Sequence, residues 1–157
     1  MIEGFNFRII WEYMPFFMEG LRNTFLISIV SLFLALLAGI TACAGRLSPW
    51  KPVRGLAIIY IESIRSTPLL VQNYFLYFGL PTLGLRVPER QTGIIALMLN
   101  SGAYIAEIVR AGRTSVPNGQ IEAGISAGLN YFQRMRFIIL PQALGVTVPP
   151  LLGQAIV

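Results

Sequence analysis

The chain has 157 residues, of which 55% are apolar and only 12% are charged, whereas a soluble globular domain carries roughly 25% charged residues. The net charge of +5 would suggest nucleic-acid binding in a soluble protein, but the basic residues lie in short stretches between apolar runs, so no nucleic-acid partner is expected. The absence of histidine and the single cysteine exclude an intrachain disulfide and most zinc sites, and no cofactor is expected.

The first predicted transmembrane span covers residues 23–45. This stretch has no charged side chain, and a bilayer core needs about 20 apolar residues in a helix. The preceding residues 1–22 are too charged for a signal peptide, but they are amphipathic and rich in aromatic residues. We expect them to lie along the outer membrane surface, in contact with lipid.

The second predicted span, residues 55–79, follows a basic loop at 46–54 and is interrupted. Glu62 and Arg65 lie inside it, and Pro68 follows them. Proline lacks a backbone donor and biases the residue before it away from helix. The pattern therefore predicts one discontinuous spanning helix with a break near Pro68.

The remaining residues predict a third span and the start of a fourth. A loop rich in Gly and Pro at 79–91 leads into the third span at 91–109, and the basic stretch 110–136 contains a predicted helix from Asn118 to Met135. Residues 137–157 are again apolar and form the start of a fourth span. We expect an all-α integral membrane domain, apparently truncated at its C-terminus, with about five spans in the full protein.

The charges of the loops predict an orientation. The segments 46–54 and 110–136 each carry an excess of three positive charges, while residues 1–22 are slightly negative. Cytoplasmic loops are enriched in Lys and Arg. We therefore expect these two segments in the cytoplasm and the N-terminus outside a bacterial cytoplasmic membrane.

The cytoplasmic stretch contains a motif of small residues that allows two interpretations. From physics alone, small residues four apart are as consistent with ordinary helix packing as with a docking surface. However, the stretch resembles the coupling loop of ABC importer permeases, in which Glu-Ala-Ala is followed by Gly and later by Ile-x-Leu-Pro. The matching positions are Glu122, Ala123, Gly128, Ile138, Leu140 and Pro141, and Gly124 stands where the family usually has its second Ala.

The resemblance extends from Leu21 to Val157 and points to the branch that imports polar amino acids. It is carried by the sequences ESIRSTPLLVQ at 62–72, YFGLP at 77–81 and NSGAYIAEIVRAG at 100–112. It implies a type I permease fold, alternating access, two copies of an ATPase subunit bound at the coupling loop, a second permease copy or paralogue, and an extracytoplasmic amino-acid-binding protein.

Arg65 is the main candidate for substrate binding. An unpaired charge near mid-membrane costs at least about 2.5 kcal/mol, so either Glu62 on the same helix face or a ligand is expected to compensate it. A guanidinium matches the planar carboxylate that every amino acid carries. The resemblance implies that Arg65 and Thr67 hold this carboxylate and that Asn100, Ser101 and Tyr104 contact the substrate from the third span.

Three further interpretations stay open at this point. Asn100 and Ser101 would also suit hydrogen bonds between helices, and Tyr104 could simply pack. Glu107 and Arg110, three residues apart, are expected to form a structural ion pair. Some relatives for basic amino acids carry Glu where Ala155 stands, so a neutral polar or acidic substrate is favoured.

Two other functions compete with transport. The chain has no phosphate-binding loop of the Walker type, so a permease of this kind would rely on a separate protein for ATP hydrolysis. An intramembrane enzyme would need a nucleophile with a base, or a metal site, and neither is visible in the sequence. A structural or sensory membrane subunit would require neither Arg65 nor the broken helix.

Overall fold

The computed structural model describes residues 7–156, which form helices joined by short turns, without a β-strand in this range. The predicted all-α membrane architecture is therefore confirmed for this part of the chain. Residues 1–6 of the expected outer segment lie outside it. The elements are α1 (Phe7–Glu12), α2 (Met14–Arg46), α3 (Lys51–Arg65), α4 (Leu69–Tyr74), the π-helix η1 (Phe75–Gly79), α5 (Leu80–Thr82), α6 (Glu89–Thr114), α7 (Asn118–Ser126), α8 (Tyr131–Arg134), the π-helix η2 (Met135–Ile139) and α9 (Leu140–Ile156).

Three helical stretches in the described range are long and apolar enough to cross a membrane. They are Met14–Arg46, Glu89–Thr114 and Tyr131–Ile156, which overlap the first, third and fourth predicted spans. The second predicted span is divided as expected, because α3 ends at Arg65 and α4 begins at Leu69. The 15 residues of α3 are too few to cross a bilayer core alone.

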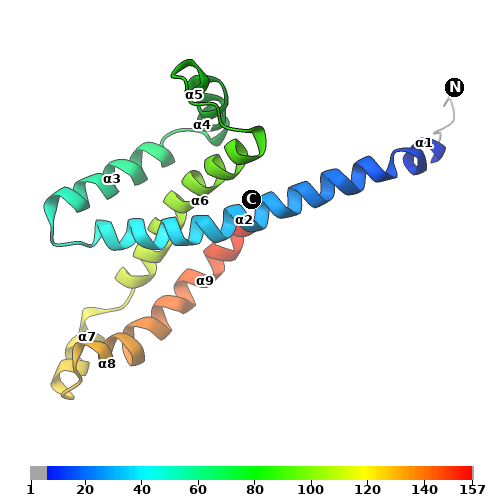
Figure 1. Cartoon of the computed structure of the whole chain (residues 1–157). Helices are drawn as coiled ribbons and strands as arrows, with labels where there is room; N and C mark the ends of the chain where they lie inside the picture. Colours follow the sequence, from blue (N-terminus) through cyan, green and yellow to red (C-terminus); the bar gives the residue numbers. More distant parts are fainter. Residues whose placement is uncertain (1–6, 157) are drawn as a thin grey trace, which may run out of the picture.

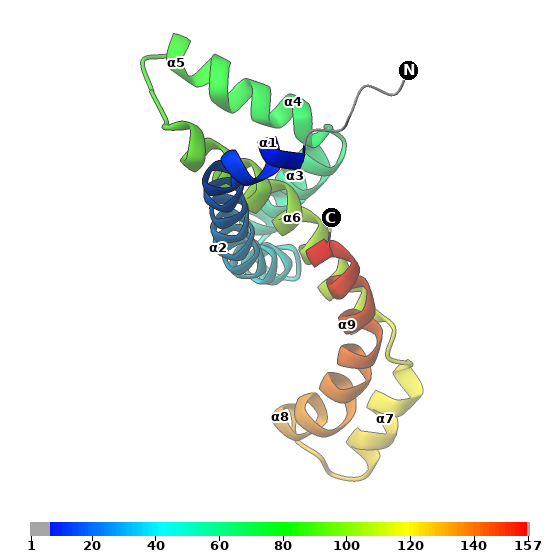
Figure 2. The ribbon, with the colours of Figure 1, turned by 90° about the vertical axis from the view of Figure 1, so that its right-hand side faces the viewer.

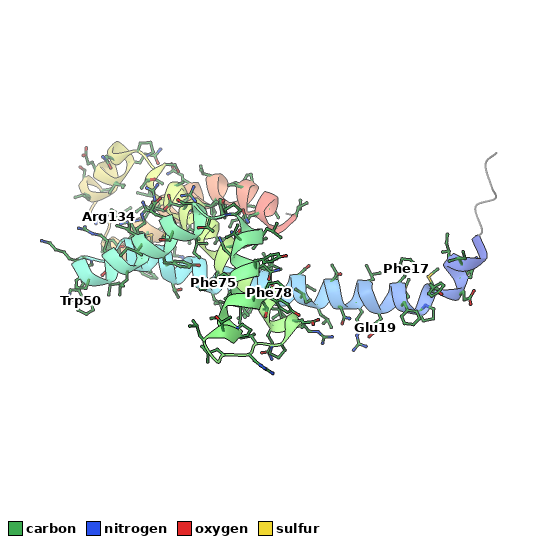
Figure 3. The ribbon with its side chains drawn as sticks, turned by 90° about the horizontal axis from the view of Figure 1, so that it is seen from above. Phe17, Glu19, Trp50, Phe75, Phe78 and Arg134 are labelled. Atoms are coloured by element: carbon green, nitrogen blue, oxygen red, sulfur yellow. The ribbon has the colours of Figure 1, made fainter. Side chains whose placement is uncertain are left out.

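Helix α2 starts earlier than the sequence suggested. It runs without interruption from Met14 to Arg46 over 33 residues, so no helix end separates residues 1–22 from the first span. Its first half projects away from the other helices, and Figure 3 shows Phe17 and Glu19 on this projecting part. Pro15 lies in the first turn, where a missing N–H costs nothing, and therefore favours an early start. That this part lies on the membrane surface stays a prediction.

The core is a close contact between α2 and α6, which cross in Figure 1. The buried residues of α2 recur every fourth position and are all small: Ser31, Ala35, Gly39 and Cys43. A Cβ atom on Gly39 would lie 2.5 Å from Cγ2 of Ile105 on α6, so only glycine permits this approach. Small residues at such spacing are the usual means by which membrane helices pack without a hydrophobic driving force.

Two π-helical segments each stand just before a proline, and in both cases the helix continues through that proline. The segment η1 ends two residues before Pro81, and η2 ends two residues before Pro141. A proline inside a helix removes one donor and its ring collides with the carbonyl four residues earlier. The wider π turn relieves that collision, so the helices continue through both prolines with a local distortion. As a result, the expected loop at 79–91 is still helical up to Thr82.

The segment from Asn118 to Met135, predicted to be helical, is helical over most of its length but is divided into two helices. At the end of α7, Gly128 adopts a positive φ of 74°. The N–H of Gly128 donates to the carbonyl of Ile125 (2.9 Å), and the N–H of Leu129 donates to the carbonyl of Gly124 (3.0 Å). This is a Schellman termination. Asn130 then caps α8 reciprocally with Gln133. Figure 2 shows α7 and α8 at one end of the molecule and α4 and α5 at the other.

Candidate functional site

The side chain of Gln72, which the sequence analysis did not single out, is hydrogen-bonded to the backbone at the break between α3 and α4. The amide nitrogen of Gln72 donates to the carbonyls of Ile64 and Thr67, both at 2.8 Å. Its amide oxygen accepts from Asn100 on α6 at 3.4 Å. At the break the carbonyl of Ile64 accepts from the N–H of Thr67 (3.2 Å), because its usual partner four residues on is Pro68, which has no N–H. Poorly paired backbone groups are costly inside a membrane. Gln72 therefore stabilises the break and ties it to α6.

Arg65 ends α3 beside this break and does not pair with Glu62. Its guanidinium lies 3.8 Å from the carboxylate of Glu107 and 5.4 Å from the centre of the Tyr104 ring. Of the two alternatives left open by the sequence, the pair with Glu62 is not formed, because Glu62 lies 3.3 Å from Arg46 instead. The side chain of Arg65 is 36% exposed, so part of its guanidinium is open to a ligand.

Glu107 is the centre of a group of charges contributed by three helices. Its carboxylate accepts from Arg110 at 2.9 Å, which confirms the expected ion pair, and it also accepts from Arg46 at the end of α2. With Glu62 and Arg65 included, three arginines face two glutamates in this group. One positive charge is therefore in excess, which favours the binding of an anion nearby.

A cavity of about 400 Å³ lies at the broken helix, and it brings together most of the predicted substrate-binding residues. Four of them line it: Arg65, Thr67, Asn100 and Tyr104. The sequence analysis missed Gln154 of α9, which lines the cavity as well. The other lining residues are Ser66, Pro68 and Leu69.

Ser101 is the predicted substrate-binding residue that lies elsewhere. It follows Asn100 on α6, and successive residues of an α-helix point about 100° apart. Ser101 consequently lines a second, smaller cavity of about 150 Å³ on another face of α6. Gln154 lines both cavities, so the two adjoin at its side chain.

Hydrogen bonding leaves the first cavity with several free acceptors and donors. The Thr67 hydroxyl donates to the carbonyl of Ser63 at 2.9 Å, so its oxygen still has a lone pair that can accept. The Arg65 guanidinium has five donors and forms one long ion pair in the described part of the chain. The site can therefore bind a group that combines a carboxylate with a donor such as an ammonium.

A second candidate site is formed by the predicted coupling residues. Glu122, Ala123 and Gly124 lie on α7, and Gly128 forms the turn after it. Gly124 is buried, and a Cβ atom there would lie 2.6 Å from Cδ1 of Ile138. Gly124 stands where the family pattern has alanine. The absence of a Cβ atom at this position allows α7 to pack closely on η2.

A shallow groove of about 400 Å³ runs along this contact. It is lined by Gln120, Ala123, Gly124, Ala127, Leu129, Phe137, Ile138 and Gln142. Glu122 is exposed beside the groove, and Leu140 and Pro141 are exposed at the start of α9 without lining it. The side chains of Gln142 and Gln120 are hydrogen-bonded across it, which fixes α7 to α9.

Comparison with known proteins places this architecture in a family. The family model described as "Binding-protein-dependent transport system inner membrane component" matches residues 9–157. The "Probable glutamine ABC transporter permease protein GlnM" of Bacillus subtilis (strain 168) is 40% identical over 149 residues, which are 95% of this chain and 69% of that protein. The "Glutamine transport system permease protein GlnP" of Escherichia coli (strain K12) is 38% identical over 98% of this chain and 71% of its own length.

A solved structure agrees with these relatives. The structure titled "Crystal structure of an amino acid ABC transporter with histidines" is 38% identical, with a TM-score of 0.88 over 98% of this chain and 72% of that one. The chain spans about two thirds of the length of the relatives it matches. The matched sequence and fold show that the chain belongs to the family of binding-protein-dependent transport system inner membrane components.

Proposed function

We propose that the chain is part of the permease subunit of an ATP-binding cassette importer that moves polar amino acids across a cytoplasmic membrane by alternating access. The observation that carries this proposal is the cavity at the broken helix, where Arg65 is only partly neutralised by Glu107. Family membership and the names of the relatives support an amino acid as the substrate class. A broken helix beside the substrate is a recurrent device in transporters, because it frees backbone groups near mid-membrane.

In this proposal the α-carboxylate of the substrate binds Arg65. The planar guanidinium can donate two parallel hydrogen bonds to a carboxylate, and the excess positive charge around Glu107 favours the anion. The Thr67 hydroxyl and the side chains of Asn100 and Tyr104 lie on the same cavity and would contact the carboxylate or the ammonium group. The ring of Tyr104, which already stacks on Arg65, would hold the guanidinium in place.

The energy would come from other proteins. The sequence has no phosphate-binding loop, so we infer that two copies of a separate ATPase subunit hydrolyse ATP and bind at α7. The groove between α7 and η2, with its lining residue Ala123 and its exposed neighbour Glu122, is the proposed contact. A second permease copy or paralogue and an extracytoplasmic binding protein complete the assembly, with the N-terminus outside.

The decisive experiment is uptake of labelled amino acid by the full-length protein, reconstituted in liposomes with its ATPase and binding protein. Arg65→Ala is expected to abolish ATP-dependent uptake while the complex still assembles. Arg86→Ala is the matched control, because Arg86 is exposed in the loop after α5, away from the cavity. Unchanged uptake by Arg65→Ala would contradict the carboxylate role, and absence of any ATP-dependent uptake by the native protein would favour a structural or sensory subunit.

A further inference from the structure

The guanidinium of Arg65 belongs both to the larger cavity and to the group of charges around Glu107. Arg65 lines the cavity, and its nitrogen Nη1 lies 3.8 Å from Oε2 of Glu107, which is not among the lining residues. Among the residues that the structure describes, no other carboxylate forms an ion pair with Arg65. Glu107 is therefore the group that compensates the charge of Arg65 in the empty cavity.

The contact between Arg65 and Glu107 is weak in comparison with the other contacts of Glu107. A charge-assisted hydrogen bond between a guanidinium and a carboxylate spans about 2.7–2.9 Å, so a separation of 3.8 Å is an ion pair without a hydrogen bond. Arg110 lies at the normal distance of 2.9 Å, and Arg46 donates to the other oxygen, Oε1, of Glu107. Glu107 consequently stays paired when Arg65 turns to a different anion.

Arg65 also has a support at the cavity that does not depend on Glu107. Tyr104 stands three residues before Glu107 on α6, and the centre of its ring lies 5.4 Å from the guanidinium carbon of Arg65. This cation–π contact persists when the ion pair is broken.

A substrate carboxylate at Arg65 would meet the Glu107 carboxylate at short range. Like charges that share a site disfavour each other, and only one guanidinium lies between these two. The substrate therefore gains the full attraction of Arg65 only when Arg65 leaves Glu107. Because the pair is long and Arg65 is 36% exposed, this exchange costs little.

On this basis we infer that Glu107 is an internal competitor of the substrate, which pairs with Arg65 in the empty cavity and is displaced from it by the substrate carboxylate. This inference rests on the proposed function and adds to it a residue that sets the affinity, which the sequence analysis placed only in a structural ion pair with Arg110. The charge of Arg65 is compensated before and after binding, and Glu107 keeps Arg46 and Arg110 in both states. The return of Arg65 to Glu107 favours release of the substrate.

The test is equilibrium binding of a radiolabelled amino acid to the purified full-length permease in its complex with the ATPase, without the binding protein. Glutamine, glutamate and arginine are compared on the native complex, and the one that binds most tightly is used for the variants. Glu107→Gln removes the competitor and keeps the size of the side chain. It is expected to raise the affinity about two- to threefold, which corresponds to the loss of one weak ion pair. Glu62→Gln is the matched control with native affinity, because it removes the same charge from the same group but pairs with Arg46 and not with Arg65.

Arg110→Ala is a second variant, which is needed because Glu107→Gln also lowers stability. It removes a nearer partner of Glu107 and is expected to strengthen the pair of Glu107 with Arg65, which weakens binding of the amino acid about twofold. In the Glu107→Gln background the same change is expected to have no effect, whereas a general effect of charge would be additive. Arg113→Ala, at an exposed position three residues further along α6, is the control with native affinity.

The outcomes separate competition from a structural role and from the proposed function. A purely structural Glu107 predicts weaker binding in Glu107→Gln, so weaker or unchanged binding in the folded variant would overturn the inference. An equal rise in Glu62→Gln would overturn it as well, and native affinity in Arg110→Ala would do so however Glu107→Gln folds. Binding that survives Arg65→Ala would contradict the proposed function itself, whereas binding lost in Arg65→Ala but unchanged in Glu107→Gln would remove only this inference.

Discussion

Replacing Glu107 with glutamine removes the carboxylate that three arginines share and keeps the size of the side chain. The side chain of Glu107 is 15% exposed, and its bond with Arg46 joins α6 to α2 with little solvent around it. Charged hydrogen bonds of this kind contribute about 1.5–3 kcal/mol each. We expect Glu107→Gln to lower the free energy of unfolding by about 2–3 kcal/mol and the melting temperature by about 4–12 °C, measured on the purified protein in detergent.

The three arginines are expected to contribute unequally to that loss. Arg46 is 21% exposed and bonds across two helices, so its coupling with Glu107 should be about 1.5–3 kcal/mol. Arg110 is 35% exposed and three residues away on the same helix, which predicts about 0.5 kcal/mol. Arg65 is 36% exposed and 3.8 Å distant, which also predicts about 0.5 kcal/mol or less.

Double-mutant cycles in which each arginine is changed to alanine, alone and together with Glu107→Gln, measure these couplings. The coupling with Glu107 is expected to be strongest for Arg46 and weaker for Arg110 and Arg65. A weak coupling of Arg65 means that its guanidinium is available to a substrate carboxylate. A coupling of Arg65 with Glu107 as large as that of Arg46 would refute this reasoning and would make Arg65 a structural residue.

Three further changes test the helix packing and the break. Gly39→Ala should destabilise the protein by about 1–3 kcal/mol, because its Cβ would collide with Ile105. Gly20→Ala on the same helix has open space around it and should be neutral or stabilising. Thermal unfolding measures both. Gly128→Ala should cost about 1–2 kcal/mol, since φ is positive there; a melting temperature equal to that of the native protein would speak against the Schellman turn. Gln72→Leu should cost about 1–3 kcal/mol and reduce substrate binding by loosening the break, and unimpaired binding in a correctly folded variant would separate the break from the cavity.

Local chemistry in the sequence was sufficient to predict the helices and their main break. Apolar stretches of spanning length and Pro68 after Ser66 and Thr67 act on the backbone directly, and the structure follows them. The turn at Gly128 was also within reach, because a glycine followed by Asn130 and then Gln133 is the pattern of one helix ending and another being capped. The helix end at Gly128 was missed because the coupling-loop motif was interpreted for its function and not for the turn that its glycine permits.

The cavities could be predicted only in part, because they depend on contacts between distant segments. The carboxylate partner of Arg65 lies 42 positions further along the chain, whereas Glu62, the alternative suggested by helical spacing, is three positions away. Gln154 carries no local signal, since a glutamine in an apolar helix is equally consistent with packing. Its place at both cavities depends on how α9 meets α6, which no residue pattern within one helix specifies.

Helix α6 lines the first candidate site and ends shortly before α7, which carries the second. It is unbroken from Glu89 to Thr114, unlike the second and fourth spans, which carry proline-induced distortions. Asn100, Tyr104 and Glu107 recur at four and then three positions and so share a face. The helix ends four residues before α7, and Gly112 lies against Thr147 of α9, where a side chain would not fit. In the proposed transport cycle, a shift of α7 would reach α6 across the three residues that separate the two helices, and α6 carries the cavity residues Asn100 and Tyr104.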